Sequence, residues 1–420
     1  VAETNLLDLM PQRLKIKYSN DLRVSRPVVL KDFLFTKRGL NLKPLLYTGK
    51  AKSETWEYAS TAKEHINMLI EENGDRPEVQ LFAEYYGEYN STSKTLSTYI
   101  DGFRKHIRSD GLFHPTYMLH KGDFGSSDKD SGTVTGRTSA KDPAWQTMPK
   151  HTIWAKPLRQ VYTPPKGMAV LKLDFSQGEL RVIACVSKEQ AMIDVYKNNG
   201  DLHSVTAAGN LNMPIEKFMA LPEEEWDELR YGGKAGNFGL IYGMSAKGYQ
   251  AYAFNSFGLR MTVAEAGATR SRFLDDLYPK IPQYHDEYIA FARKNGYVTN
   301  PMGRVRRLPL IGSRDSKVRS TAERQAINSP IQSALSDVCL LAMVEIDKVY
   351  PDLWIFGNTH DELQFYVPEE EIDIGAKRIK DIMENVPLHK FGWTPELQFT
   401  VDAGASSVNL AECYKIHGLR

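Results

Sequence analysis

The sequence has only three cysteines among 420 residues, Cys185, Cys339 and Cys413, and no CxxC pair. Scattered single cysteines exclude a disulfide scaffold and a cysteine-based zinc site, and they suggest reduced thiols in a cytosol-like compartment. No apolar run is long enough to be interpreted as a membrane span, and the first residues, VAETNLLDLMPQ, do not have the shape of a signal peptide. The hydrophobic content of 42%, with 25% charged residues, is ordinary for a soluble globular protein.

A strong net charge is also missing, since the formal value is +1, and so the composition as a whole gives no signature of a nucleic-acid binder. Residues 91–160 are the local exception, with eleven Lys and Arg, six Asp and no Glu. A basic, Gly/Ser/Thr-rich stretch with interleaved aromatic residues suits contact with a phosphate backbone. A solvated loop would explain this segment equally well.

The segment AVLKLDFSQGELRVIA, residues 169–184, predicts a buried strand that ends at Asp174, a polar turn and then a helix beginning near Glu179. A carboxylate at a strand end points toward a crevice, because strand ends adjoin loops and solvent. By itself, Asp174 could equally be a capping residue at a strand–helix junction.

A second acidic site follows in LWIFGNTHDELQFYV, residues 353–367, which predicts a hydrophobic hairpin with His360, Asp361 and Glu362 near its tip. A polar hairpin turn is the alternative. Acids near other carboxylates are costly unless a cation neutralises them. Carboxylates from two strands, completed by substrate phosphates, are a usual way to hold Mg²⁺, so Asp174 and Asp361 are candidate ligands.

In RYGGKAGNFGLIYGM, residues 230–244, four side chains recur at intervals of four: Arg230, Lys234, Phe238 and Tyr242. On a helix they would share a face that could bind a triphosphate through the cations and a base or sugar through the rings. The five glycines argue against a rigid helix and would allow a pivot or the close approach of a ligand. The segment is not a P-loop, because the GxxxxGK[ST] order is absent.

Residues 317–349 predict one long helical region, which Pro330 would bend. Arg324, Asn328 and Gln332 again fall four residues apart. A row of Arg, Asn and Gln is more typical of a reader of base edges or of the minor groove than of a core face.

Together, five motifs in family order resemble those of the family A DNA polymerases, which are bacterial, phage and organellar repair and replication enzymes. DFSQGELR resembles DYSQIELR, RYGGKAGNFGLIYG resembles RRxxKxxNFGxxYG, and THDEL resembles VHDEL. TGRTSAKDPAWQTMP and ERQAINSPIQ resemble TGRLSSxxPNLQNIP and ERxAxNxPxQ. The resemblance covers nearly the whole chain.

The fold that this resemblance implies is an α+β right-hand polymerase, with an antiparallel sheet in the palm and with helical fingers and thumb. The expected parts are an N-terminal palm-associated segment (1–44), the thumb (45–115), the first part of the palm (116–185), the fingers (186–322) and the second part of the palm (323–420). VDAGASSVNLAE resembles the closing strand of the family, so we expect that end to be complete. About 45 residues before the thumb are too few for a proofreading exonuclease domain.

For the catalytic centre, the resemblance implies that Asp174 and Asp361 bind two Mg²⁺ ions, which Mn²⁺ could replace. Glu362 would be a supporting acid, and Phe175 would lie at the metals. Lys234 would contact the incoming triphosphate and act as general acid for the pyrophosphate.

The resemblance further implies a set of binding residues. Those for the dNTP are Arg230 and His203 near the triphosphate, Phe238 on the sugar and base, Tyr242 near the templating position, Glu179 as the gate against a 2′-hydroxyl, and Gln177. Those for the primer–template are Arg137, Gln146, Arg324, Asn328, Gln332 and His360.

Three positions depart from the family pattern. Gly178 stands where Ile is usual, which predicts a looser closed state and greater tolerance of mispairs. Gly232 and Gly233 predict a frayed start of the fingers helix. Phe238 in place of Tyr predicts discrimination against dideoxynucleotides.

The expected partners are primer–template DNA and dNTPs, with no membrane, for a monomer that could meet processivity or replisome factors. We expect the cytoplasm of a bacterial or phage-infected cell, with an organelle matrix or nucleoid as alternatives. Two other functions are considered. A single-subunit RNA polymerase is disfavoured by Glu179 and THDEL, and a catalytically silent DNA-binding or clamp-like protein is disfavoured by the intact Asp174 and Asp361.

Overall fold

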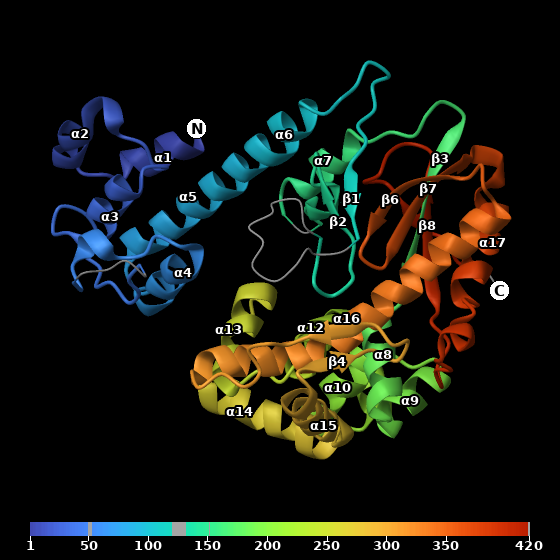
Figure 1. The fold of residues 1–420 in the computed structure, drawn as a ribbon. Helices are drawn as coiled ribbons and strands as arrows, with labels where there is room; N and C mark the ends of the chain where they lie inside the picture. Colours follow the sequence, from blue (N-terminus) through green and yellow to red (C-terminus); the bar gives the residue numbers. More distant parts are fainter. Residues whose placement is uncertain (49–52, 120–131, 151, 419–420) are drawn as a thin grey trace. The chain divides into compact units, whose positions relative to one another are not determined.

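The computed structural model describes residues 1–48, 53–119, 132–150 and 152–418. The chain divides into two compact units, which are described separately (Figure 1). One unit comprises Val1–His114 with Met148–Leu158, and the other comprises Pro115–Thr147 with Arg159–Arg420.

The first unit is helical. Leu6 near the N-terminus and Val79 far along the chain belong to one buried core. Residues 1–44 therefore pack with the helices of the predicted thumb. Pro77 is the first residue of α5, where its missing N–H costs no hydrogen bond. The helices are α1 Ala2–Asp8, α2 Gln12–Tyr18, α3 Pro27–Phe35, α4 Lys63–Glu72, α5 Pro77–Lys94, the π-helical η3 Thr95–Ile100 and α6 Asp101–Arg104.

The second unit is built on a five-stranded antiparallel sheet of order β6-β7-β3-β8-β9 (Figure 1). Strand β3 alternates, so that Leu171, Leu173 and Phe175 are buried on one face, which α17 Ile372–Glu384 helps to cover. The predicted strand ending at Asp174 and the predicted hairpin of residues 353–367 are both confirmed. The strands are β3 Met168–Phe175, β6 Trp354–Thr359, β7 Glu362–Pro368, β8 Val401–Ser406 and β9 Tyr414–Lys415.

Helices occupy most of the sequence between β3 and β6. These helices and the sheet share one hydrophobic core, whose residues lie between Ala169 and Ala405 in the sequence. The helices are α8 Gly178–Ser187, α9 Gln190–Lys197, α10 Leu202–Asn210, α11 Ile215–Met219, α12 Glu223–Leu240, α13 Ala246–Phe257, α14 Val263–Ser271, the π-helical η5 Arg272–Leu277, α15 Lys280–Asn295 and α16 Ser316–Val349.

Two short strand pairs complete the unit. In one pair, β4 Tyr297–Thr299 lies antiparallel to β5 Val305–Arg307. Strand β1 Thr116–Met118 pairs with β2 Ser139–Lys141. Helix α7 Ala155–Gln160 contains a boundary between the units, since Leu158 belongs to the first and Arg159 to the second. Part of the predicted basic loop, residues 120–131 with Lys121 and Lys129, lies outside the described residues.

The glycines of residues 230–239 do not break α12, which is continuous from Glu223 to Leu240 and differs from the flexible or frayed segment that we expected. A Cβ on Gly233 would lie 2.1 Å from the His203 carbonyl oxygen of α10, and one on Gly239 would lie 3.0 Å from the Tyr252 ring of α13. These two glycines allow neighbouring helices to pack closely against α12. Gly232, by contrast, has open space at its Cβ position.

Helix α16 confirms the long helix predicted for residues 317–349, with Pro330 inside it. By length and composition it is also apolar enough to cross a membrane, which the sequence analysis did not anticipate. Because 61% of the most apolar 18-residue stretch of α16 is buried within the protein, α16 has the character of a core helix.

Candidate active site

Three acids meet at one end of the central strands. In the antiparallel register of β3 and β7, Asp174 lies opposite Glu362. The backbone amide of Phe175 donates a 3.3 Å hydrogen bond to the carbonyl of Asp361, which lies in the turn between β6 and β7. The pairing of β3 with β7 therefore brings together the two predicted acidic segments, residues 169–184 and 353–367.

The surroundings of Cys339 also place the two aspartates together. Burial and, after it, the charges of Asp361 and Asp174 raise the pKa of this thiol on α16. Both carboxylates consequently lie near one sulfur atom. Glu362 is only 6% exposed, and its carboxylate accepts a hydrogen bond from the Gln364 side chain.

The donor chemistry of this strand end fits Mg²⁺, because carboxylate oxygens are hard ligands. Among the described residues, no group of three or more His, Cys, Asp or Glu is arranged to hold a metal ion. The protein would thus supply Asp174 and Asp361, and water or phosphate oxygens would complete the shell. The Phe175 side chain is buried in the core, so only its backbone carbonyl could contribute.

Glu179 connects two further predicted residues. It lies in the first turn of α8, and its carboxylate accepts hydrogen bonds from the Arg137 guanidinium and from the Tyr242 hydroxyl. Burial and the neighbouring Glu179 charge raise the pKa of Tyr242 well above its ordinary value, so the phenol is a neutral donor. The predicted sugar gate, the templating-side tyrosine and one predicted DNA contact therefore form a single cluster.

Gly178, immediately before Glu179, is buried against α16. A Cβ at this position would lie 2.5 Å from Cδ1 and 2.9 Å from Cδ2 of Leu335, which is itself 2% exposed. The missing side chain does not leave a void, because Leu335 fills the space. The predicted looser closed state and greater tolerance of mispairs remain predictions.

Arg230 of α12 makes a two-point ion pair with Asp201, the N-cap of α10, with Nε–Oδ2 at 2.6 Å and Nη2–Oδ1 at 3.0 Å. Burial alone would raise the pKa of Asp201, but the hydrogen bonds from Arg230 and Ser204 outweigh it and lower the value to about 2. Asp201 is therefore an anion throughout the neutral range. Gln177 reaches the same carboxylate, with its Nε2 3.4 Å from Oδ1.

His203 is buried two residues further along α10. Burial outweighs the opposing charge of Asp201 and lowers the pKa of His203 to about 4. Its Nδ1 lies 2.9 Å from the Asn237 amide nitrogen, which must donate, and so the neutral ring carries its proton on Nε2. The Phe238 ring centroid is 5.7 Å from that of His203. Lys234 lies near enough for its charge to act on the histidine.

The predicted DNA-contact residues on α16 lie on one continuous helix, as expected. Arg324 is exposed and donates to the hydroxyls of Ser320 and Thr321 at 2.8 and 3.0 Å. The Asn328 Oδ1 is buried, with no hydrogen-bond partner among the residues that the structure describes. Gln332 is half-buried on the same helix.

Two other predicted DNA contacts belong to the β2–β6 region. The Gln146 amide donates to the Thr138 hydroxyl at 2.6 Å and to the Asn358 carbonyl at 3.0 Å, and it accepts from the Ala140 amide. Gln146 thus ties β2 to β6 within the protein. His360 takes a left-handed conformation in the hairpin turn, with φ of 64°.

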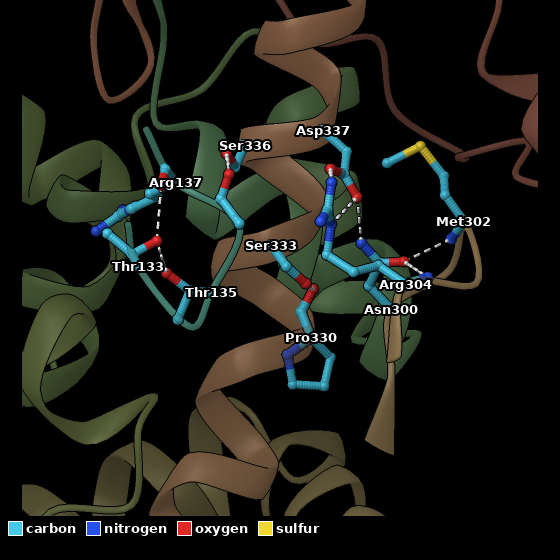
Figure 2. A network of polar contacts seen from close by, with 11 residues as sticks. Thr133, Thr135, Arg137, Asn300, Met302, Arg304, Pro330, Ser333, Ser336 and Asp337 are labelled. Atoms are coloured by element: carbon cyan, nitrogen blue, oxygen red, sulfur yellow. Dashed lines mark hydrogen bonds and ion pairs between the residues drawn. The ribbon is translucent and has the colours of Figure 1, made fainter. Parts of the chain in front are cut away.

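Sequence reasoning missed the polar contacts that hold the Arg137 segment and the β4–β5 turn against α16. Figure 2 shows α16 between this segment and the β4–β5 turn. The Ser336 hydroxyl donates to the Gly136 carbonyl at 2.8 Å, and Asp337 accepts from Arg304 Nε at 2.9 Å and from Asn300 Nδ2 at 2.7 Å. No local motif marks these residues, because their partners are far apart in the chain.

The chain is similar to known proteins over most of its length. The family described as DNA polymerase family A matches residues 5–407. DNA polymerase I of Caldicellulosiruptor bescii is 34% identical over 309 residues, which cover 71% of this chain and 33% of the relative. DNA polymerase I of Bacillus subtilis is 31% identical over 367 residues, which cover 86% of this chain and 37% of the relative. The chain spans about a third of the length of these relatives.

A solved structure is similar over almost the whole chain. It is the POL domain of Pol1 from M. smegmatis in complex with DNA primer-template and dNTP. The TM-score is 0.75 at 25% sequence identity, and the match covers 97% of this chain and 64% of the other. The right-hand fold predicted from the sequence is therefore confirmed.

Proposed function

The chain belongs to DNA polymerase family A, and we propose that it is a template-directed DNA polymerase that adds dNTPs to the 3′ end of a primer. The observation that carries this proposal is the register that sets Asp174 opposite Glu362, with Asp361 in the adjoining turn. Hard oxygen donors at a strand end, close to a helix that presents Arg230 and Lys234, suit phosphate chemistry.

In the proposed reaction, Asp174 and Asp361 would hold two Mg²⁺ ions, or Mn²⁺ in their place. When bound, such ions neutralise phosphate charge and make the attacking hydroxyl a better nucleophile. Arg230 and Lys234 would bind the triphosphate, and Lys234 would give a proton to the departing pyrophosphate. The Nε2–H of neutral His203 would donate a hydrogen bond to the same phosphates.

The cluster around Glu179 would select the substrate. Its carboxylate is held between Arg137 and Tyr242, and a ribose 2′-hydroxyl would compete for the space beside it. Phe238 would pack on the nucleotide, with Gln177 near its phosphates. Arg137, Gln146, Arg324, Asn328, Gln332 and His360 are proposed to contact the primer–template.

Primer extension tests this function. We expect Asp174→Ala to lower the rate with Mg²⁺ by roughly a thousandfold or more, because a metal ligand is lost. Primer–template affinity, measured by fluorescence anisotropy, should be almost unchanged. Asp347→Ala, which removes an exposed aspartate from the far end of α16, is the matched control and should extend normally.

The same assay separates the competing functions. Extension with dNTPs but not NTPs is expected of a DNA polymerase, and the reverse preference would indicate an RNA polymerase. DNA binding without extension by the wild-type protein would indicate a silent binding protein. We propose that the protein acts as a monomer in the cytoplasm of a bacterial or phage-infected cell, as the bacterial origin of the relatives suggests.

A further inference from the structure

Asp201 has two sets of partners that belong to different elements. As the N-cap of α10, one carboxylate oxygen accepts from the Ser204 amide at 3.0 Å and from the Ser204 hydroxyl at 2.7 Å. The same carboxylate binds Arg230 of α12 through two hydrogen bonds. Both members of the ion pair are largely buried, with side chains 29% exposed for Arg230 and 24% for Asp201. Asp201 therefore connects two helices at a charged residue of the proposed triphosphate site.

Asp201 binds only one edge of the Arg230 guanidinium. Nε and Nη2 face Asp201, and Cζ lies 5.4 Å from the Trp226 ring centroid, one turn earlier on α12. Among the described residues, no hydrogen bond from Nη1 is present. Because a guanidinium is planar with five donors, fixing one edge also fixes the direction of the other.

Asp201 also reaches the turn after β3. The Gln177 Nε2 lies 3.4 Å from the Asp201 Oδ1, and the Gln177 Oε1 accepts from the Tyr196 hydroxyl at 2.9 Å. Gln177 takes a left-handed conformation as the N-cap of α8, three residues after Asp174. A single carboxylate thus links the helix carrying Arg230 to the turn that follows the proposed metal ligand.

We propose that Asp201 is a positioning residue for nucleotide binding, which holds Arg230 so that its Nη1 edge is directed at the triphosphate. This inference rests on the proposed function, since it assigns Arg230 to the triphosphate. A long, flexible arginine normally loses rotamer freedom when it binds a ligand, and Asp201 restricts that freedom beforehand. The carboxylate also reduces the net positive charge at the site, but orientation is the larger effect here because the contact has two points.

The substitution Asp201→Asn tests this role with little damage to the fold. Asparagine is as good an N-cap as aspartate, so α10 keeps its cap, whereas Arg230 loses its anionic partner. We expect the KM for dNTP to rise about fivefold, from the cost of ordering one long side chain, with kcat changed less than about twofold. Asp315→Asn, which makes the same change at the N-cap of α16, is the matched control and should leave both constants unchanged.

A double-mutant cycle establishes whether Asp201 acts through Arg230. In an Arg230→Gln background, Asp201→Asn should have no further effect on KM. An unchanged or lower KM in the single variant would overturn the proposal, and so would an equal effect in both backgrounds.

A binding measurement separates this inference from the proposed function. Calorimetric titration of the free protein with tripolyphosphate requires no polymerisation. Asp201→Asn and Arg230→Gln should each weaken the binding, and the double variant should lose less affinity than the sum of the two single losses. If the wild-type protein extends no primer but this pattern holds, the proposed function fails and the positioning role of Asp201 stands. If extension succeeds and tripolyphosphate binding is the same in all variants, the positioning role is wrong.

Discussion

The side chain of Leu335 occupies the space that a Cβ on Gly178 would enter, at 2.5 Å from its Cδ1. This contact joins the first turn of α8, which carries Glu179, to the core helix α16. A larger residue at position 178 must therefore displace either Leu335 or the turn that holds the proposed sugar gate.

This complementarity predicts strong coupling between the two positions. Gly178→Ile should destabilise the protein by about 1–3 kcal/mol through overpacking, and Leu335→Ala by about 2–5 kcal/mol through a cavity. The double variant should be more stable than the sum of the two effects implies, because the added side chain at position 178 can fill the space that the truncation at position 335 leaves. Urea unfolding of the four proteins measures this, and strictly additive changes would contradict the contact.

The same double variant gives the sharper test of nucleotide selection. We predicted from the sequence that Gly178 loosens the closed state and permits mispairs. If so, Gly178→Ile in the Leu335→Ala background should lower misincorporation relative to Leu335→Ala alone. An unchanged error frequency, measured by single-nucleotide extension opposite each template base, would exclude a role for Gly178 in fidelity.

Phe238 is predicted to set the response to chain terminators. Phe238→Tyr should raise dideoxynucleotide incorporation relative to dNTP by at least about tenfold, since a buried-site hydroxyl can replace a missing sugar hydrogen bond. The ratio of the two kcat/KM values measures the change. Tyr242→Phe, which alters a phenol one turn later, serves as the control and should not raise this ratio.

The lowered pKa of His203 predicts how stability depends on pH. The pKa of His203 is about 4 in the folded protein and 6.5 in the unfolded chain. Between these pH values the unfolded chain therefore binds more protons at this residue. Stability should therefore fall as the pH drops from 6.5 toward 4, by about 2 kcal/mol for this group. In urea unfolding at pH 7 and pH 4.5, His203→Gln should remove that part of the loss, whereas replacing the exposed His389 by Gln should not.

The bond from Ser336 to the Gly136 carbonyl predicts an effect on DNA binding, because Gly136 precedes Arg137. Ser336→Ala should weaken primer–template affinity about threefold through loss of one hydrogen bond to that segment. Ser333→Ala is closely matched, since Ser333 is also buried on α16 but its hydroxyl bonds within the helix, to Pro330. Equal affinity of the two variants, measured by fluorescence anisotropy, would show that the Ser336 bond does not position Arg137.

The local pattern around Asp174 and Asp361 was sufficient to predict both strands and the hairpin, because alternation and turn residues act over a few positions. For the glycines of α12, by contrast, the local pattern was misleading. They indicated flexibility, yet Gly233 and Gly239 lie where α10 and α13 approach the helix closely. Intrinsic propensity cannot anticipate a neighbouring helix from another part of the chain.

The sequence by itself determined the family, the order of the motifs, the residue types of the site and the main helices and strands around it. Only the tertiary structure decided that Asp201 holds Arg230, that Leu335 fills the space at Gly178, and that Ser336 anchors the segment before Arg137. Each of these depends on contacts between segments distant in the chain, and their geometry follows from how helices and strands pack. A single sequence carries no local signal for such a contact.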